Sequence, residues 1–185
     1  ISHKTWCFIM NEIMIDAKNI IRDFSISRGM FRKRQNLRAI DGVSLKILRG
    51  EVLGLVGESG CGKTTLAKIL LGLLPQTEGS IRLCGQDISK IHRLTLAKMI
   101  QPVFQDPYSS LNPRKTIGSI IALPMKVQGD IRPEEWENRV RKMMDLVGLS
   151  SRMFHQYPNQ LSGGQRQRVA IARALINQPE IIICD

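Results

Sequence analysis

Gly57-Glu58-Ser59-Gly60-Cys61-Gly62-Lys63-Thr64-Thr65 is the stretch that decides the fold of this 185-residue chain. Its glycines let backbone N–H groups turn inward toward an anion, and a helix that begins at the loop exit brings its positive end to the same place. A glycine-rich turn between a buried strand and a helix would explain the glycines but not Lys63 and Thr64. The stretch therefore predicts a phosphate-binding loop, with Lys63 on the β- and γ-phosphates and the Thr64 hydroxyl on Mg²⁺.

The flanks of the loop have the composition that such a loop requires. Residues 52–56 read Val-Leu-Gly-Leu-Val, a short apolar run of strand length. Residues 64–74 carry apolar side chains spaced as on one helix face, namely Leu66, Ile69, Leu70, Leu73 and Leu74. Strand, loop and helix follow in the order of an α/β phosphate-loop NTPase.

A second possible anion site lies about a hundred residues later, at Leu161-Ser162-Gly163-Gly164-Gln165. A helix is predicted to follow it, with an apolar face formed by Val169, Ala172, Leu175 and Ile176. A hydroxyl and bare N–H groups would then stand at a positive helix end, which suits an anion. An ordinary N-cap, with Ser162 capping and the glycines easing the turn, is the alternative interpretation.

Four segments in this order resemble the nucleotide-binding subunit of ATP-binding cassette (ABC) transporters. They are the phosphate loop, Val103-Phe104-Gln105-Asp106-Pro107, the segment Leu161–Gln165, which is similar to the signature of that family, and Ile181-Ile182-Ile183-Cys184-Asp185. The resemblance implies that Gly57, Glu58, Ser59, Gly60, Cys61, Gly62, Lys63, Thr64, Thr65 and Gln105 bind ATP. It further implies a metal site at Thr64, Gln105 and Asp185, and catalytic roles for Lys63, Gln105 and Asp185. Leu161, Ser162, Gly163, Gly164 and Gln165 would face the ATP that is held by a partner subunit.

A narrower resemblance links the chain to dipeptide and oligopeptide importers. It rests on residues 106–114, Tyr157-Pro158 and 165–175, and residues 29–33 are similar to the second, F-type ATPase subunit of those systems. This resemblance implies ATP-driven peptide import at the cytoplasmic face of a bacterial inner membrane. The implied partners are a second ATPase subunit, two permease subunits and an extracytoplasmic substrate-binding protein.

The expected architecture is one domain built from a RecA-like phosphate-loop core, a small antiparallel β subdomain and a helical subdomain. The approximate bounds are 11–50 for the β part, 51–105 for the core, 106–162 for the helical part, and 163–185 for the signature helix and the last strand. Short strands are expected at 13–17, 20–24 and 39–47. In the β part, Phe24 is a candidate for stacking on adenine, as in the family, or a core aromatic.

In the helical part, Pro133 at the first turn and Gly148 as a stop indicate a helix. The methionines of the helical part are interpreted as residues that fill its core rather than as a binding surface.

Composition bounds the function further. The chain is 43% hydrophobic, and no run approaches the roughly 20 apolar residues of a membrane span. Nothing before Met10 is expected to form a signal peptide.

The four cysteines, Cys7, Cys61, Cys84 and Cys184, lie far apart and fit a reducing cytosol. Cys61 is interpreted as a reactive bystander inside the loop.

The formal charge of +11 raises an alternative function, that of a soluble ABC-type ATPase acting on nucleic acid or ribosomes. The basic residues are scattered, however, with a triplet at 32–34, others on a helix near Arg139, and others on the signature helix. A protein beneath an anionic leaflet has an equal reason to be basic. The triplet is interpreted as a solvated loop, and no nucleic-acid partner is expected.

Two features depart from the family pattern. Pro102 precedes Gln105 in a presumed strand, where it removes a ladder hydrogen bond and indicates an edge or a bulge. The sequence stops at Asp185, before the glutamate that acts in the family as general base. The 185-residue chain is therefore expected to hydrolyse ATP poorly and to be marginally folded by itself.

Overall fold

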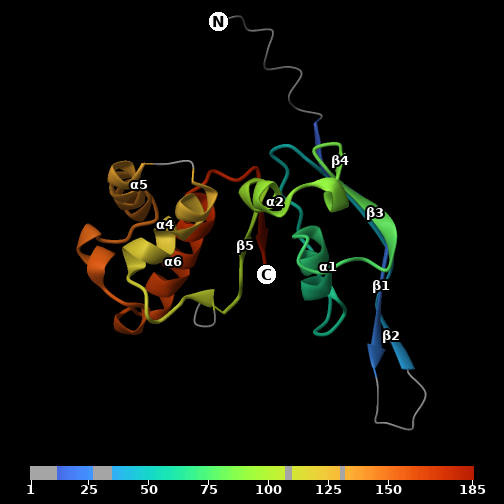
Figure 1. Ribbon diagram of the computed structural model, residues 1–185. Helices are drawn as coiled ribbons and strands as arrows, with labels where there is room; N and C mark the ends of the chain where they lie inside the picture. Colours follow the sequence, from blue (N-terminus) through green and yellow to red (C-terminus); the bar gives the residue numbers. More distant parts are fainter. Residues whose placement is uncertain (1–11, 27–34, 107–109, 130–131) are drawn as a thin grey trace, which may run out of the picture. The chain divides into compact units, whose positions relative to one another are not determined.

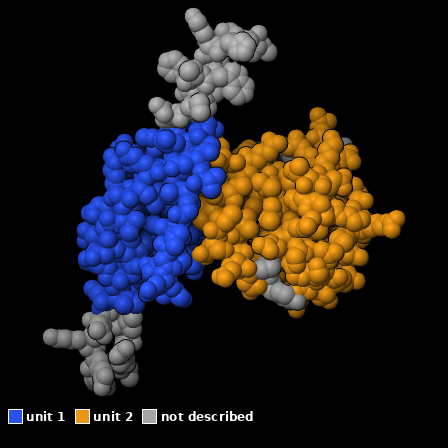
Figure 2. Space-filling view, turned by 180° about the vertical axis from the view of Figure 1, so that it is seen from behind, with its two compact units in different colours: residues 1–96 blue, residues 97–185 orange. Residues whose placement is uncertain are grey.

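The computed structural model describes residues 12–26, 35–106, 110–129 and 132–185. The predictions for Cys7, for the segment before Met10 and for the basic triplet at 32–34 lie outside these residues. The chain divides into two compact units, residues 1–96 and 97–185 (Figure 2).

The first unit contains an antiparallel sheet that includes the expected strands near 13–24 and 39–47 and adds two strands from the stretch expected in the phosphate-loop core. Its strands are β1 (Ile13–Ile26), β2 (Gln35–Leu48), β3 (Glu78–Leu83) and β4 (Gln86–Asp87), in the spatial order β2-β1-β3-β4 (Figure 1). Ile15, Ala17, Ile81 and Leu83 are almost fully buried, so β1 and β3 line the core of this unit. A short 3₁₀ turn η1 (Ile88–Lys90) and helix α2 (Arg93–Met99) follow β4.

Strand β1 is continuous where two short strands were expected. The junction between them contains a register irregularity rather than a break, with Asn19 at φ 50°. The Asn19 N–H donates to the Ser44 hydroxyl at 2.8 Å, so the irregular residue is still held by the neighbouring strand. Asparagine tolerates positive φ better than most residues, which lets the strand continue through this point.

The two segments that flank the phosphate loop differ from the prediction. Helix α1 (Lys63–Leu70) ends four residues before Leu74, because Gly72 adopts φ 67° and its N–H returns to the Ile69 carbonyl. Residues 52–56 form no strand, and Val52 and Val56 are 97% and 96% exposed. A strand requires a hydrogen-bonded neighbour, and neither sheet among the described residues includes this segment.

The second unit is built around a helical core. Its helices are α4 (Ile117–Gln128), α5 (Pro133–Leu146) and α6 (Gly163–Leu175), with 3₁₀ turns η2 (Ser151–His155) and η3 (Pro158–Gln160) between the last two. Their shared core includes Ile117, Ile121, Met125, Met144 and Val169. The interpretation of Met125 and Met144 as core filler is therefore confirmed.

Helix α5 begins and ends where the sequence indicates. Pro133 occupies its first turn, and Gly148 adopts φ 71° just beyond its end. Val140 and Met144 are fully buried, and the Trp136 ring stacks on that of Phe154 with centroids 5.8 Å apart. Among the described residues, no helix has both the length and the apolar composition needed to cross a membrane.

Two short strands, β5 (Ile100–Val103) and β6 (Ile181–Cys184), form a parallel pair in the same unit. Pro102 lies within β5 opposite Ile183. In the described part of the chain β5 has β6 on one side only, so Pro102 stands in an edge strand as expected.

Candidate functional site

The phosphate loop ends in a lysine that starts the following helix. Lys63 begins α1, and its Nζ donates to the carbonyl oxygens of Gly57 and Glu58, each at 2.7 Å. These partners are neutral, so they orient the ammonium without cancelling its charge. Gly62 precedes the helix at φ 99°, a conformation that glycine adopts without strain. The loop thus presents a fixed positive group beside a helix start, which suits a phosphate.

Cys61 lies within the same loop. Its Sγ is 3.6 Å from Lys63 Nζ, and its side chain is exposed. A Cβ added at Gly57 would lie 2.7 Å from this sulfur, so the thiol packs against the bare face of a glycine. A group attached to Cys61 would therefore enter the space around the Lys63 ammonium.

We expect alkylation of Cys61 to block ATP binding, and Mg-ATP to slow the alkylation. The reason is steric, because phosphates held at Lys63 and an alkyl group on Cys61 compete for one small space. The measurement is the labelling rate by mass spectrometry with and without saturating Mg-ATP, with the partly exposed Cys84 as internal control. Equal labelling rates at Cys61 in both conditions would contradict the predicted position of the nucleotide.

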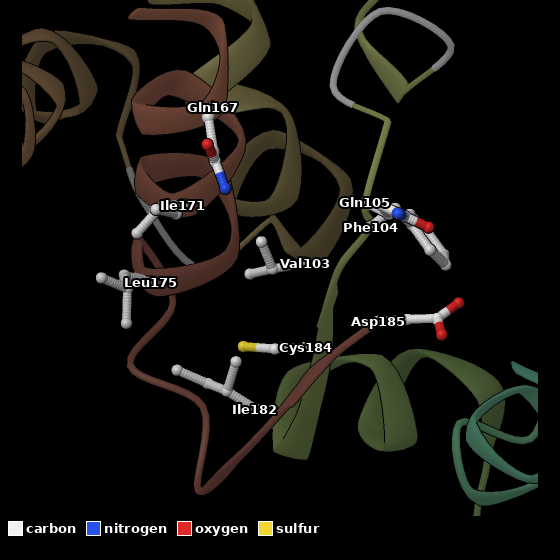
Figure 3. Close-up of a pocket in the computed structure, with 9 residues that line it drawn as sticks. All are labelled: Val103, Phe104, Gln105, Gln167, Ile171, Leu175, Ile182, Cys184 and Asp185. Atoms are coloured by element: carbon white, nitrogen blue, oxygen red, sulfur yellow. The ribbon is translucent and has the colours of Figure 1, made fainter. Parts of the chain in front are cut away.

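Gln105 and Asp185 come together in the second unit. They follow the carboxyl ends of β5 and β6, where Val103 pairs with Cys184 and the Asp185 N–H donates to the Val103 carbonyl at 3.0 Å. Both side chains are exposed and project from the ends of the two strands (Figure 3). The carboxyl end of parallel strands is the usual place for ligand-binding residues in α/β proteins.

A cavity of about 390 Å³ opens beside these two residues. Its walls come from β5, β6 and one face of α6 (Figure 3). The lining residues are Val103, Phe104, Gln105, Gln167, Ile171, Leu175, Ile182, Cys184 and Asp185. Most of this lining is apolar, and its polar members are Gln105, Gln167 and Asp185.

The oxygen donors predicted for Mg²⁺ are chemically suited to it. A carboxylate at Asp185, an amide at Gln105 and a hydroxyl at Thr64 are hard oxygen ligands, and Mg²⁺ usually takes few protein ligands and completes its shell with water and phosphate. No cluster of three or more His, Cys, Asp or Glu side chains occurs among the described residues.

The signature segment forms a capped helix start. Ser162 is the N-cap of α6, with its Oγ accepting from the Gln165 N–H at 3.3 Å while its own N–H donates to Gln165 Oε1 at 2.9 Å. Ser162 is therefore an N-cap, and this capping does not test the anion site that the sequence predicts here. A Cβ at Gly163 or Gly164 would meet no atom within 4 Å, so packing does not demand glycine there. Their role toward a partner's ATP stays a prediction.

Three arginines on α6 have a role that sequence reasoning missed. Arg166 Nε donates to the Pro158 carbonyl at 2.6 Å, and Arg168 Nη1 donates to the carbonyls of Val147 and Gly148 at 3.1 and 3.2 Å. Arg173 Nη1 donates to the Ser110 carbonyl at 2.5 Å. These side chains bind main-chain carbonyls of their own chain, and Arg166 is buried while Arg168 remains exposed. The spacing of these arginines along α6 does not indicate which carbonyl oxygens they contact.

Phe24 lies in β1 opposite Leu37, half-buried. The Arg22 guanidinium carbon stands 4.7 Å from the centre of its ring. Phe24 is thus not part of the buried core, and the negative face of its ring already attracts one planar cation. Its stacking on adenine stays a prediction.

Comparisons with known proteins agree with the motif order. Residues 40–185 match the family described as ABC transporter. The chain belongs to this family. It is 42% identical to the di/tripeptide transport ATP-binding protein DppF of Pseudomonas aeruginosa, over 94% of this chain and 55% of that protein. It is 44% identical to the oligopeptide transport ATP-binding protein AppF of Bacillus subtilis, over 94% of this chain and 54% of that protein.

A solved structure supports the fold of this ABC family member. It is the dimeric post-hydrolysis state of an ATP-binding cassette bound to ADP and Pi, with a TM-score of 0.80, 33% identity, and coverage of 93% of this chain and 73% of that one. The α/β phosphate-loop fold and the family resemblance are thereby confirmed. The chain spans about half the length of the curated relatives that it matches.

Proposed function

We propose that the full-length protein to which this chain belongs binds and hydrolyses ATP to drive the import of dipeptides or oligopeptides. The observation that carries the proposal is its similarity, along 94% of its length, to proteins named for peptide transport. The phosphate loop, the pair of Gln105 and Asp185, and the capped signature helix all lie within residues 40–185, which match the family. The alternative of an ATPase acting on nucleic acid has no support from these names, and three arginines of α6 bind carbonyls within the chain.

Each site residue has a physical role in the proposal. Phosphoryl transfer to water depends mainly on positioning and on charge stabilisation. Lys63 and the N–H groups of residues 57–65 would hold the phosphates, and Phe24 would stack on the base. Thr64, Gln105 and Asp185 would hold Mg²⁺, which neutralises phosphate charge when bound. Gln105 would also orient the attacking water.

The proposal places the protein at the cytoplasmic face of a bacterial inner membrane as a peripheral subunit. The protein would pair with a second ATPase subunit. The ATP bound to that subunit would be contacted by the signature residues of this chain, Leu161, Ser162, Gly163, Gly164 and Gln165. Two permease subunits would supply the membrane path, and an extracytoplasmic binding protein would deliver the peptide. The dimeric state of the similar cassette supports the pairing of two ATPase subunits.

The test is reconstitution of the full-length protein with its permeases in vesicles. We expect ATP to drive uptake of a labelled dipeptide or oligopeptide when the binding protein is present, and Asp185→Asn to abolish uptake because one carboxylate ligand is lost. Leu94→Ser, an exposed position on α2, serves as the control. ATP hydrolysis stimulated by RNA or ribosomes, but not by peptide-loaded binding protein, would contradict the proposal.

A further inference from the structure

The Arg22 side chain links β1 to the segment that follows α1. Its guanidinium carbon stands 4.7 Å from the centre of the Phe24 ring, and its Nη1 donates to the Pro75 carbonyl at 2.9 Å. Side chains two residues apart on a strand point to the same face of the sheet, which explains why Arg22 and Phe24 meet. One guanidinium therefore contacts both an aromatic ring and a main-chain oxygen.

The segment after α1 is itself held against β1 beside Arg22. The Thr77 N–H donates to the Ile21 carbonyl at 2.8 Å, and the Thr77 hydroxyl accepts from the Asp23 N–H at 3.0 Å. These two bonds lie on either side of Arg22 in sequence, so the Pro75 carbonyl has a set position relative to the strand. A hydrogen bond from a charged donor is stronger than a neutral one, so this carbonyl restrains the guanidinium. Arg22 is thus a fixed support for the ring.

The Phe24 ring lies near the phosphate loop along the sheet. Phe24 pairs with Leu37, and Ala39 lies two residues, about 7 Å, farther along β2. A Cβ on Gly62 would come within 2.6 Å of the Ala39 carbonyl oxygen, so this part of β2 touches the exit of the loop. A nucleoside triphosphate whose phosphates lie at the loop can therefore reach the ring with its base.

The Phe24 ring is supported on one face by the guanidinium and is only half-buried. Nucleobases stack on exposed aromatic faces, and a ring has two such faces. A ring that is already held in place loses less conformational freedom when a base stacks on it. By covering one face, Arg22 leaves the other for the base in a defined orientation.

We propose that Arg22 is a positioning residue for the nucleobase, which holds the Phe24 ring as a preformed platform for the base of ATP. This inference rests on the proposed ATP-binding function. Arg22 acts through Phe24 rather than on the phosphates, so its loss should weaken recognition of the base and leave the phosphate loop intact. The role concerns nucleotide affinity and does not depend on which cargo is transported.

The experiment measures the Kd of Mg-ATP and of inorganic tripolyphosphate for the full-length protein by calorimetry. We expect Arg22→Met to raise the Kd for ATP about fivefold, the size expected when one cation–π contact is lost. The Kd for tripolyphosphate should change less than about twofold, because this probe has no base to stack. Lys18→Met is the matched control: it lowers the net charge equally on the same strand, at a side chain that is 64% exposed, and should leave both constants near wild type.

A double-mutant cycle tests whether Arg22 acts through the ring. Phe24→Leu alone should raise the Kd for ATP about tenfold, because base stacking is lost. Arg22→Met in that background should add less than about twofold, since residues that act as a pair are not additive. Additive losses, or an equal weakening of tripolyphosphate binding by Arg22→Met, would overturn the inference.

Arg22→Gln decides if thermal melting shows that Arg22→Met does not fold. It keeps an amide donor for the Pro75 carbonyl but removes the cation from the ring. Weaker ATP binding with unchanged tripolyphosphate binding supports the inference, and wild-type ATP binding overturns it. Absence of ATP binding by the wild-type protein would overturn the proposed function and the inference with it, whereas ATP binding that is indifferent to Arg22 would overturn the inference alone.

Discussion

Lys63→Ala is expected to lower the rate of ATP hydrolysis by the full-length protein about 10²–10³-fold and to abolish transport. Lys63 is the positive group that the loop carbonyls of Gly57 and Glu58 hold in place. Without it, charge that develops on the transferred phosphate loses its fixed cationic partner. ATP affinity should also fall, because the ammonium contributes in the ground state as well. Phosphate release and binding of a fluorescent ATP analogue measure the two effects.

The matched control is Lys68→Ala, which removes an exposed lysine from the same helix. It changes the net charge by the same amount but lies outside the loop, so both constants should stay near wild type. Lys63→Arg keeps the charge in a bulkier, planar group that does not reproduce a compact ammonium, so we expect little recovery. Wild-type hydrolysis by Lys63→Ala would refute the assignment of the phosphate loop.

Local chemistry made much of the site predictable from sequence. A glycine-rich loop that runs directly into Lys63 and Thr64 is typical of phosphate binding, and Ser162 with Gln165 forms a capping box within four consecutive residues. Pro133 and Gly148 bracket α5 because each restricts or frees its own backbone. The shared site of Gln105 and Asp185 was implied by the family resemblance, and the parallel pairing of β5 with β6 brings the ends of their strands together.

Features that depend on distant partners were not predictable. The apolar run at 52–56 has the composition of a buried strand, yet it is exposed, because composition does not supply a neighbouring strand. Leu73 satisfies helical spacing, but Gly72 ends the helix before it. The contact of Arg173 with Ser110 involves a main-chain carbonyl, which leaves no signature in residue type.

The second large effect is expected at Gly62, where Gly62→Ala should destabilise the first unit by about 3 kcal/mol. Two costs combine at this position. The residue adopts φ 99°, which side chains rarely tolerate, and a Cβ would lie 2.6 Å from the Ala39 carbonyl oxygen. Ala39 belongs to β2, which is hydrogen-bonded to β1, so that oxygen cannot retreat without disturbing the sheet.

Gly60→Ala separates the two costs. Gly60 has a similar backbone angle, φ 83°, but a Cβ there would meet no atom within 4 Å. It should therefore lose only about 1–2 kcal/mol from backbone strain. Denaturant unfolding of the full-length protein gives both values, and ATP-analogue binding shows whether α1 still begins at the loop.

Because the clash at Gly62 displaces the start of the helix that carries Lys63 and Thr64, Gly62→Ala should also lose nucleotide binding, whereas Gly60→Ala should weaken it only moderately. Equal losses of stability in the two variants would mean that backbone strain alone accounts for the glycine at 62, and that β2 does not hold the loop where it lies.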